Sequence, residues 1–361
     1  SCFPKWGRAS QNDENIGLMN NRVLVIYTGG TIGMVEGEDG SLRPFAMEHI
    51  YDVLPLLRST TYAIDSCQLE HIIDSSNMTP SLWVDIAEIV EREYDKYDGF
   101  VVLHGTDTMA YTASALSFIF KNLSKPIVLT GSQLPLGMLR SDGRDNIICA
   151  LEIAAQRDVV IPEVCIFFQS HLYRGNRSTK VSAEHFDAFT SYNYPSLAKA
   201  GISIEYKRHL ILPPAEGRLM VRRQFDTNVA ILKLFPGIQP SVVRQVIATP
   251  GLKGLIIETF GSGNAPTEGW FIDALKEGID RGLVILDVTQ CKSGAVKLRQ
   301  YEASCDLARI GVLSGHDITI EAAVTKMMFL LGIHGDDLPL VRQRLETSIR
   351  GEMSTNENYN L

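Results

Sequence analysis

Two predicted strands each end in a turn that carries threonine. Residues 23–34 (VLVIYTGGTIGM) read as a buried strand that runs into a glycine turn with Thr28 and Thr31. Residues 99–104 (GFVVLH) read as a second strand, and the turn GTDT with Thr106 follows it. A threonine hydroxyl becomes a nucleophile when a base takes its proton. The two turns therefore predict one site in which Thr31 and Thr106 face the same small substrate.

Other polar side chains also follow predicted strands. Asp74, Ser75 and Ser76 come after the apolar run 69–73 and just before a predicted helix. Hydroxyls in such a loop can bind a carboxylate, and the alternative is that they cap the helix. Lys180 closes a polar loop, where a lone lysine is usually a solvated charge. Held against a threonine and a carboxylate, a lysine would instead repeat the logic of the Ser-His-Asp arrangement.

Strands and helices alternate around these residues with short connections. The predicted strands are 23–28, 69–73, 99–103, 125–130 and 163–168. One helix is predicted to begin at Thr79-Pro80, with an apolar face made of Trp83, Ile86, Ala87, Val90 and Tyr94. Such alternation predicts a parallel sheet with helices on both faces. Ligands bind these sheets beyond the carboxyl ends of the strands. That edge holds Thr28, Thr31, Thr106, Asp107, Ser132 and Gln133.

The chain of 361 residues is long enough for two domains. We predict a larger N-terminal α/β domain at 22–206, a linker at 207–224 rich in proline and basic residues, and a smaller C-terminal α/β domain at 225–361. The second domain is predicted to contain strands 228–235, 254–260 and 283–288 and helices 270–281 and 318–331, the last capped by Asp317.

Several classes of function fit the sequence poorly. The glycine spacing after the first strand is GGxxG, which is not the dinucleotide fingerprint, and no phosphate-binding P-loop motif occurs. A net charge of −8 without a basic cluster argues against nucleic acid. No apolar run reaches membrane length, and residues 1–21 lack the apolar core of a secretory signal. None of the six cysteines forms a CxxC pair, which favours a reduced, cytoplasmic compartment.

A family resemblance covers nearly the whole chain, from about Arg22 to Glu352. The motifs, in order, are YTGGTIGM, DSSNM, HGTDTMAYTASALSF, TGSQLPL, LYRGNRSTK, GSGNAP and VTQC. Together they resemble the bacterial-type L-asparaginases, most closely the cytoplasmic type I branch, to which mammalian asparaginase domains are also similar. The resemblance implies a dimer or homotetramer of two-domain α/β subunits, with each site completed by a neighbouring subunit. It also implies that L-asparagine is hydrolysed to L-aspartate and ammonia without a cofactor or a metal.

The same resemblance implies roles for residues at matching positions. Thr31 matches the nucleophile, and Thr106, Asp107 and Lys180 match a second triad. The expected substrate-binding residues are Asp74, Ser75, Ser76, Gly30, Ser132 and Asn264. We expect Thr31 to attack the side-chain amide and form a β-aspartyl ester, while Lys180 manages protons through Thr106. Backbone N–H groups near both threonines are expected to stabilise the oxyanion.

Two positions depart from the family pattern. Many members carry a tyrosine in the loop after the first threonine, here residues 35–46, where the matching residue is Ser41. That loop is predicted either to close over the substrate or to be an idle hairpin tip. The type I branch can bind asparagine at an allosteric site that uses an arginine and a T-Q-C turn. Thr289, Gln290 and Cys291 are present, but the arginine position is Glu258, so we predict that this allostery is absent or altered.

Three alternatives remain open at this point. A glutaminase-leaning enzyme differs only by the length of its substrate, and one methylene is worth only about 1–3 kcal/mol of discrimination. An amidase subunit of a tRNA-dependent amidotransferase would need a partner and an RNA-contacting extension, which the acidic charge disfavours. A catalytically dead asparagine sensor would conflict with the intact threonine, aspartate and lysine positions.

Overall fold

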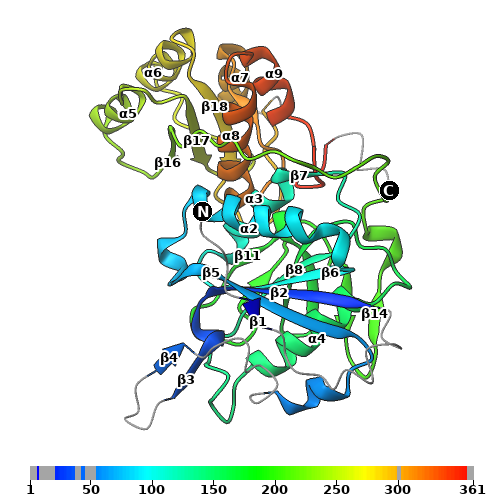
Figure 1. Cartoon of the computed structure of the whole chain (residues 1–361). Coiled ribbons are helices and arrows are strands. Elements are labelled where there is room, and N and C mark those ends of the chain that lie inside the picture. The colour runs from blue at the N-terminus through cyan, green and yellow to red at the C-terminus, as the bar shows by residue number, and fades with distance from the viewer. Residues whose placement is uncertain (1–5, 8–20, 37–41, 45–53, 299–301, 356–361) are drawn as a thin grey trace. The chain divides into compact units, whose positions relative to one another are not determined.

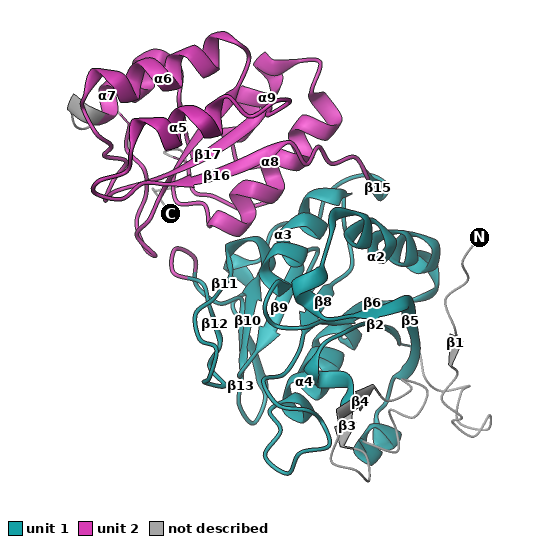
Figure 2. Ribbon diagram, turned by 90° about the vertical axis from the view of Figure 1, so that its left-hand side faces the viewer, with its two compact units in different colours: residues 1–191, 195–221 teal, residues 192–194, 222–361 magenta. Residues whose placement is uncertain are grey.

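The computed structural model describes residues 6–7, 21–36, 42–44, 54–298 and 302–355. The chain divides into two compact units, which Figure 2 shows in different colours. The first unit comprises residues 1–191 and 195–221, and the second comprises 192–194 and 222–361. The main division, between 221 and 222, falls inside the stretch 207–224 that was predicted as a linker. In the second unit, the side-chain amide of Asn193 donates to the carbonyl oxygen of Asp317 at 3.1 Å.

The first unit contains a nine-stranded sheet in the order β1-β5-β2-β6-β8-β9-β10-β13-β14. Its centre is parallel and consists of β5 (Ala63–Ile73), β2 (Arg22–Gly29), β6 (Gly99–Leu103), β8 (Ile127–Thr130) and β9 (Val164–Phe168). The outer strands pair antiparallel: β1 (Trp6–Gly7), β10 (His171–Arg174), β13 (Ala198–Ala200) and β14 (Ile204–Tyr206). The predicted α/β fold is confirmed, and the antiparallel edges are an addition that the sequence pattern had not shown.

Helices on both faces explain why the central strands are apolar throughout. Helices α2 (Pro80–Glu93) and α3 (Met109–Ile119) lie on one face, and α4 (Gly143–Ala155) lies on the other (Figure 1). Every residue of β6 is buried, as is every residue of β2 after Arg22. Because both faces exclude water, polar groups can meet solvent only beyond the strand ends.

Helix α2 starts at the predicted residue, whereas helix α8 (Ile320–His334) does not. Thr79 occupies the N-cap position of α2, but its side chain makes no capping bond and instead pairs with the hydroxyl of Ser81 at 2.8 Å. Helix α8 is capped by Thr319, whose hydroxyl oxygen accepts a backbone N–H, so the prediction of Asp317 as the cap was wrong. Both threonine and aspartate cap helices well, and the sequence pattern placed the start of α8 two residues early.

The loop predicted at 35–46 is described only in part. Strand β3 (Met34–Glu36) pairs antiparallel with β4 (Leu42–Pro44), which makes a hairpin directly after the first threonine turn. Its tip, which includes Ser41, lies outside the described residues, as does most of 1–21.

The second unit is built on a four-stranded sheet whose strands all run parallel. Its order is β16 (Val229–Lys233), β17 (Gly254–Thr259), β18 (Val284–Thr289) and β19 (Leu313–Ser314). Its helices are α5 (Pro240–Ile247), α6 (Gly269–Asp280), α7 (Glu302–Ile310), α8 and α9 (Leu338–Leu345). The apolar core of this unit includes Leu255, Phe271 and Ile285. Helices α5, α7 and α9 were not predicted.

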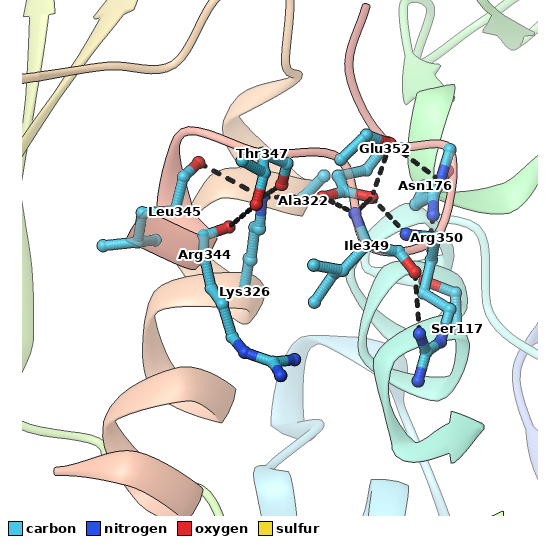
Figure 3. Close-up of polar contacts among 12 residues, drawn as sticks. Ser117, Asn176, Ala322, Lys326, Arg344, Leu345, Thr347, Ile349, Arg350 and Glu352 are labelled. Carbon is cyan, nitrogen blue, oxygen red and sulfur yellow. Dashed lines mark hydrogen bonds and ion pairs between the residues drawn. The ribbon is translucent and has the colours of Figure 1, made fainter. Parts of the chain in front are cut away.

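A buried ion pair joins α8 to the turn that follows α9. Lys326 and Glu352 are both completely buried, with Nζ 2.6 Å from Oε1 (Figure 3). The ammonium also donates to the carbonyls of Leu345 and Thr347, and Glu352 accepts the backbone N–H of Ile349. Burial alone would raise the pKa of Glu352, but the Lys326 ammonium and the N–H donors outweigh it and lower this pKa.

Replacing one partner of this pair should lower the free energy of unfolding far more than replacing both. In Lys326→Met the Glu352 carboxylate stays buried without its cation, so the free energy of unfolding should fall by about 3–5 kcal/mol. The double variant Lys326→Met/Glu352→Met should recover most of that loss. Thermal and urea unfolding of the three proteins measure this, and a loss below about 1 kcal/mol in the single variant would contradict the expectation.

Candidate active site

Glycines bring three strand ends of the first unit into direct contact. A Cβ atom on Gly30, whose φ is +88°, would lie 2.5 Å from the Cα of Gly105. A Cβ on Gly105 would lie 2.6 Å from the Oγ of Ser75, and one on Gly29 would lie 2.0 Å from the carbonyl oxygen of Ile73. Any side chain at these glycines would separate the ends of β2, β5 and β6. The predicted convergence of separate segments at one sheet edge therefore exists at the level of the backbone.

Lys180 lies against Thr106 and Asp107. It belongs to β11 (Thr179–Lys180), and its Nζ donates to the Thr106 hydroxyl at 2.8 Å and to Asp107 Oδ1 at 2.6 Å. The lysine side chain is only 18% exposed, whereas that of Asp107 is 66% exposed. The Thr106 oxygen thus accepts from a cation, which favours loss of the hydroxyl proton, in an arrangement open to water on one side only.

The Thr106 hydroxyl forms a second hydrogen bond, with Gln133. Thr106 donates to Gln133 Oε1 at 3.2 Å, and the Gln133 amide nitrogen donates to the carbonyl of His185 at 3.1 Å. The backbone N–H of Gln133 donates to the Asp142 carboxylate at 3.0 Å. Gln133 was placed at this edge from the sequence but not counted among the site residues. Its side-chain contact with Thr106 has no signal in the sequence, because it depends on the distance between two strand ends.

Ser132, its neighbour, was expected to bind substrate. Its side chain is buried, and its hydroxyl donates to the carbonyl of Leu134 at 2.6 Å.

The loop after β5 is organised by Asp74. The carboxylate accepts from the backbone N–H of Ser76 at 2.9 Å and from its hydroxyl at 3.0 Å, and these bonds lower the pKa of Asp74. Asp74 thereby caps the short 3₁₀ turn η5 (Ser75–Asn77), whereas the serines do not cap α2, whose N-cap position is Thr79. Thr108 donates to the carbonyl of Ser75 at 2.7 Å and so ties the loop to the Thr106 turn. Asp74 and Ser76 are nevertheless exposed and open to a ligand.

The two threonines of the first turn differ in environment. Thr28 is buried, and its hydroxyl donates to the carbonyl of Leu103 at 2.9 Å, which makes it a structural residue. Thr31 begins the 3₁₀ turn η2 (Thr31–Gly33) and is half-buried. Its hydroxyl forms no hydrogen bond with the residues that the structure describes. Thr31 follows Gly30 and Thr106 follows Gly105, and these two glycines pack on each other.

The remaining candidates lie in the second unit. Asn264 closes a turn by pairing its backbone with Phe260. The Thr289 hydroxyl donates to the carbonyl of Gly261, in the same turn, at 2.5 Å, and accepts from the backbone N–H of Cys291. The Gln290 amide donates to the carbonyl of Glu258 at 2.8 Å. Thr289 thus holds the turn that carries Asn264, Gln290 bonds to the strand before that turn, and Cys291 is exposed.

A buried carboxyl lies beneath the same turn. Asp287 is completely buried on β18, and its Oδ1 accepts from the hydroxyl of Thr259 at 2.6 Å. Its Oδ2 has no hydrogen-bond partner among the described residues and would lie 3.1 Å from a Cβ on Gly263. Burial raises the pKa of Asp287 to about 7, and the Thr259 hydroxyl opposes that rise. Sequence reasoning missed Asp287, which stands inside an apolar strand.

The comparisons with known proteins agree along the whole chain. The family models "Asparaginase, N-terminal" and "Glutaminase/Asparaginase C-terminal domain" match residues 22–212 and 228–343. L-asparaginase 1 of Escherichia coli K12 is 43% identical, over 94% of this chain and all of its own length. A mouse protein named 60 kDa lysophospholipase is also 43% identical, and the match spans 62% of its length.

A solved L-asparaginase structure is also similar to nearly the whole chain. The crystal structure of L-asparaginase I from Vibrio cholerae superposes with a TM-score of 0.85 at 40% identity, covering 93% of this chain and 99% of that one. In the part of the chain that is described, no helix combines the length and apolar character that a membrane crossing needs.

The buried carboxyl predicts a pH-dependent stability. Because the folded state raises the pKa of Asp287 from 3.8 to about 7, it holds a proton there that the unfolded chain has released, and the resulting stabilisation is lost as pH rises through this window. Asp287→Asn should therefore be more stable than the wild type at pH 8, with little difference at pH 4. Melting temperatures from pH 4 to 8 measure the difference.

Asp226 provides a control, because its pKa is shifted in the opposite direction. Burial would raise its pKa, but the hydrogen bonds from Lys253 and Asn228 lower it overall. Asp226→Asn should accordingly lose stability at pH 8. A melting-temperature difference for Asp287→Asn that does not change between pH 4 and 8 would show that Asp287 does not titrate in this range.

Proposed function

Because this chain belongs to the asparaginase family, we propose that it hydrolyses L-asparagine to L-aspartate and ammonia through a threonine nucleophile. The chain is an amidohydrolase by its family, and the proposal adds the substrate and the mechanism. The observation that carries the mechanism is the contact of Lys180 with both Thr106 and Asp107. It links an amine, a hydroxyl and a carboxylate by hydrogen bonds, and the amine in its neutral form is the base that activation of a threonine requires.

The reaction proceeds in two steps. The Thr31 oxygen bonds to the side-chain amide carbon, and the C–N bond breaks as the hydroxyl proton passes to the departing nitrogen, which leaves as ammonia. A water molecule then attacks the β-aspartyl ester, the bond to Thr31 breaks, and the proton returns to its hydroxyl. Lys180 moves protons through Thr106 in both steps, and Asp107 keeps Lys180 in place. Backbone N–H groups of the Gly29–Thr31 and Thr106 turns stabilise the oxyanion.

The loop after β5 is proposed to hold the other end of the substrate. Asp74 takes the α-amino group, and Ser75 and Ser76 take the α-carboxylate. The exposure of Asp74 and Ser76 and the bond from Thr108 to Ser75 support this, because they place the loop beside the reacting turn. Gly30 lets the first turn approach closely. Asn264 and Ser132 are also proposed to bind the substrate, and a neighbouring subunit completes the site in a cytoplasmic dimer or homotetramer that needs no cofactor, nucleic acid or membrane.

The proposal also has to account for how Thr31 is activated and for which of two substrates is preferred. The absence of a tyrosine between Tyr27 and Tyr51 leaves water, Ser41 or the hairpin geometry to assist Thr31. Glutamine is the competing substrate, since one methylene changes the transition-state free energy by only about 1–3 kcal/mol. A purified chain that releases ammonia from free asparagine without RNA would exclude the amidotransferase-subunit alternative.

Removing either reacting hydroxyl should abolish turnover. Thr31→Val and Thr106→Val should each lower kcat by about a thousandfold or more, and Lys180→Met by a similar factor, because members of a coupled triad are not additive. A coupled ammonia assay with asparagine and with glutamine measures both activities.

Thr28→Val is the matched control. It makes the same change in the same turn, but Thr28 only bonds the carbonyl of Leu103, so kcat should stay within about threefold of the wild type while stability falls by about 1 kcal/mol. Near-normal turnover by both Thr31→Val and Thr106→Val would refute the mechanism.

Allosteric activation by asparagine is expected to be absent or altered in this chain. Glu258 places a carboxylate where an arginine would bind the effector's own carboxylate, and the side chains of Thr289 and Gln290 already donate to the carbonyls of Gly261 and Glu258. The rate should therefore rise hyperbolically with asparagine concentration. A sigmoidal curve that Glu258→Gln or Thr289→Val abolishes would contradict this expectation.

A further inference from the structure

A buried histidine stands directly behind the Thr106 turn. His104 follows β6, and its side chain is completely inaccessible to water. Its Nδ1 lies 2.6 Å from the carbonyl oxygen of Gly105, and its Nε2 lies 2.8 Å from the hydroxyl of Thr112 on α3. The indole N–H of Trp83 on α2 donates to the same hydroxyl at 3.1 Å. The imidazole is thus held between a hydroxyl of α3 and one peptide group, and α2 reaches it only through Thr112.

These contacts allow a single direction of hydrogen bonding. A carbonyl oxygen can only accept, so Nδ1 must carry the proton, and in the neutral ring Nε2 must then accept. Thr112 therefore donates to Nε2, and its oxygen accepts from Trp83, which can only donate. The chain runs from Trp83 through Thr112 and His104 to Gly105. Burial lowers the pKa of His104 to about 4, and the bond to the Gly105 carbonyl opposes that shift, so the neutral tautomer persists at neutral pH.

The last acceptor in the chain fixes a peptide plane. The Gly105 carbonyl and the Thr106 N–H belong to the same trans peptide and point in opposite directions. Among the described residues the Gly105 oxygen has no other hydrogen-bond partner, and the Thr106 N–H has no acceptor. Anchoring the carbonyl on the buried side leaves the N–H directed away from the core, beside the hydroxyl that Lys180 contacts.

No second hydrogen bond anchors this peptide among the described residues. Gly105 has no side chain, and its neighbours on this side are Gly30 and the Ser75 side chain. These close contacts limit where the peptide lies, and the bond from His104 Nδ1 fixes the direction of its carbonyl. A donor that stabilises an oxyanion must be fixed before the reaction begins.

We propose that His104 is a positioning residue that holds the Thr106 N–H in its oxyanion-binding orientation through the Gly105 carbonyl. This inference rests on the proposed function for its catalytic consequence, although the orientation of the peptide itself does not depend on it. His104 does not touch the substrate, so its effect falls on the transition state rather than on ground-state binding.

The test compares two replacements of the imidazole. An asparagine side chain at position 104 can place an amide N–H near the position of Nδ1, whereas a leucine side chain fills similar space without a donor. His104→Leu should lower kcat for asparagine about 10- to 100-fold, a part of the effect of losing an oxyanion donor. KM for asparagine, and Kd for aspartate measured by calorimetry, should stay within about threefold. His104→Asn should keep kcat within about fivefold. The same comparison can be made at Thr112, which donates to His104 Nε2. Thr112→Val should have a lowered kcat, and Thr112→Ser, which keeps the hydroxyl, should not.

A second readout is independent of turnover. In protein labelled with ¹⁵N-threonine, the Thr106 amide signal should move in His104→Leu and stay near its wild-type position in His104→Asn. A wild-type protein that releases no ammonia would refute the proposed function, and the amide signal would still decide the role of His104. The inference is wrong if the signal is the same in all three proteins. It is also wrong if His104→Leu turns over normally, or if both variants lose kcat, substrate affinity and melting temperature together, as a purely structural residue would.

Discussion

The close approach of three strand ends is the constraint on which the site depends. Gly29, Gly30 and Gly105 have no Cβ atoms, and the spaces those atoms would fill are occupied by the backbone of neighbouring strands and by Ser75. This contact sets the separation of the turns that carry Thr31 and Thr106. The Lys180 ammonium and the Asp74 loop lie around turns whose spacing these glycines determine. The helices and the buried strands serve to keep these ends in register.

The sequence was informative where a residue's role is decided locally. Buried strands such as β2 and β6 follow from continuous apolar runs, and their order along the chain predicts a parallel sheet whose ligand edge is known in advance. The predicted boundaries of β6 agree with the structure to the residue. The N-cap position of Thr79 was predicted correctly, but that of α8 was not, because Asp317 and Thr319 are both good N-caps by type and differ in which backbone groups they reach.

Residues that act across the fold could not be assigned from the pattern alone. A lysine at the end of a polar loop is usually solvated, and only the pairing of β11 with its neighbour carries Lys180 to Thr106. The family resemblance supplied that residue, but it did not supply Gln133, His104 or Asp287. Gln133 and Asp287 make their decisive contacts with elements distant in sequence, whereas His104 contacts the adjacent Gly105 and Thr112 of the helix that follows. All three stand in segments whose composition already has a structural explanation.

The way the chain divides between its two units has a consequence for cutting the protein apart. Residues 192–194 group with the second unit although the residues on both sides belong to the first, and Asn193 bonds the backbone at Asp317. The polypeptide thus passes between the units at more than one point. A fragment that begins at Arg222 would lack this short excursion, so the second unit cannot be expressed whole by a single truncation. Fragment complementation or domain grafting in this fold would have to carry the excursion along with the C-terminal part.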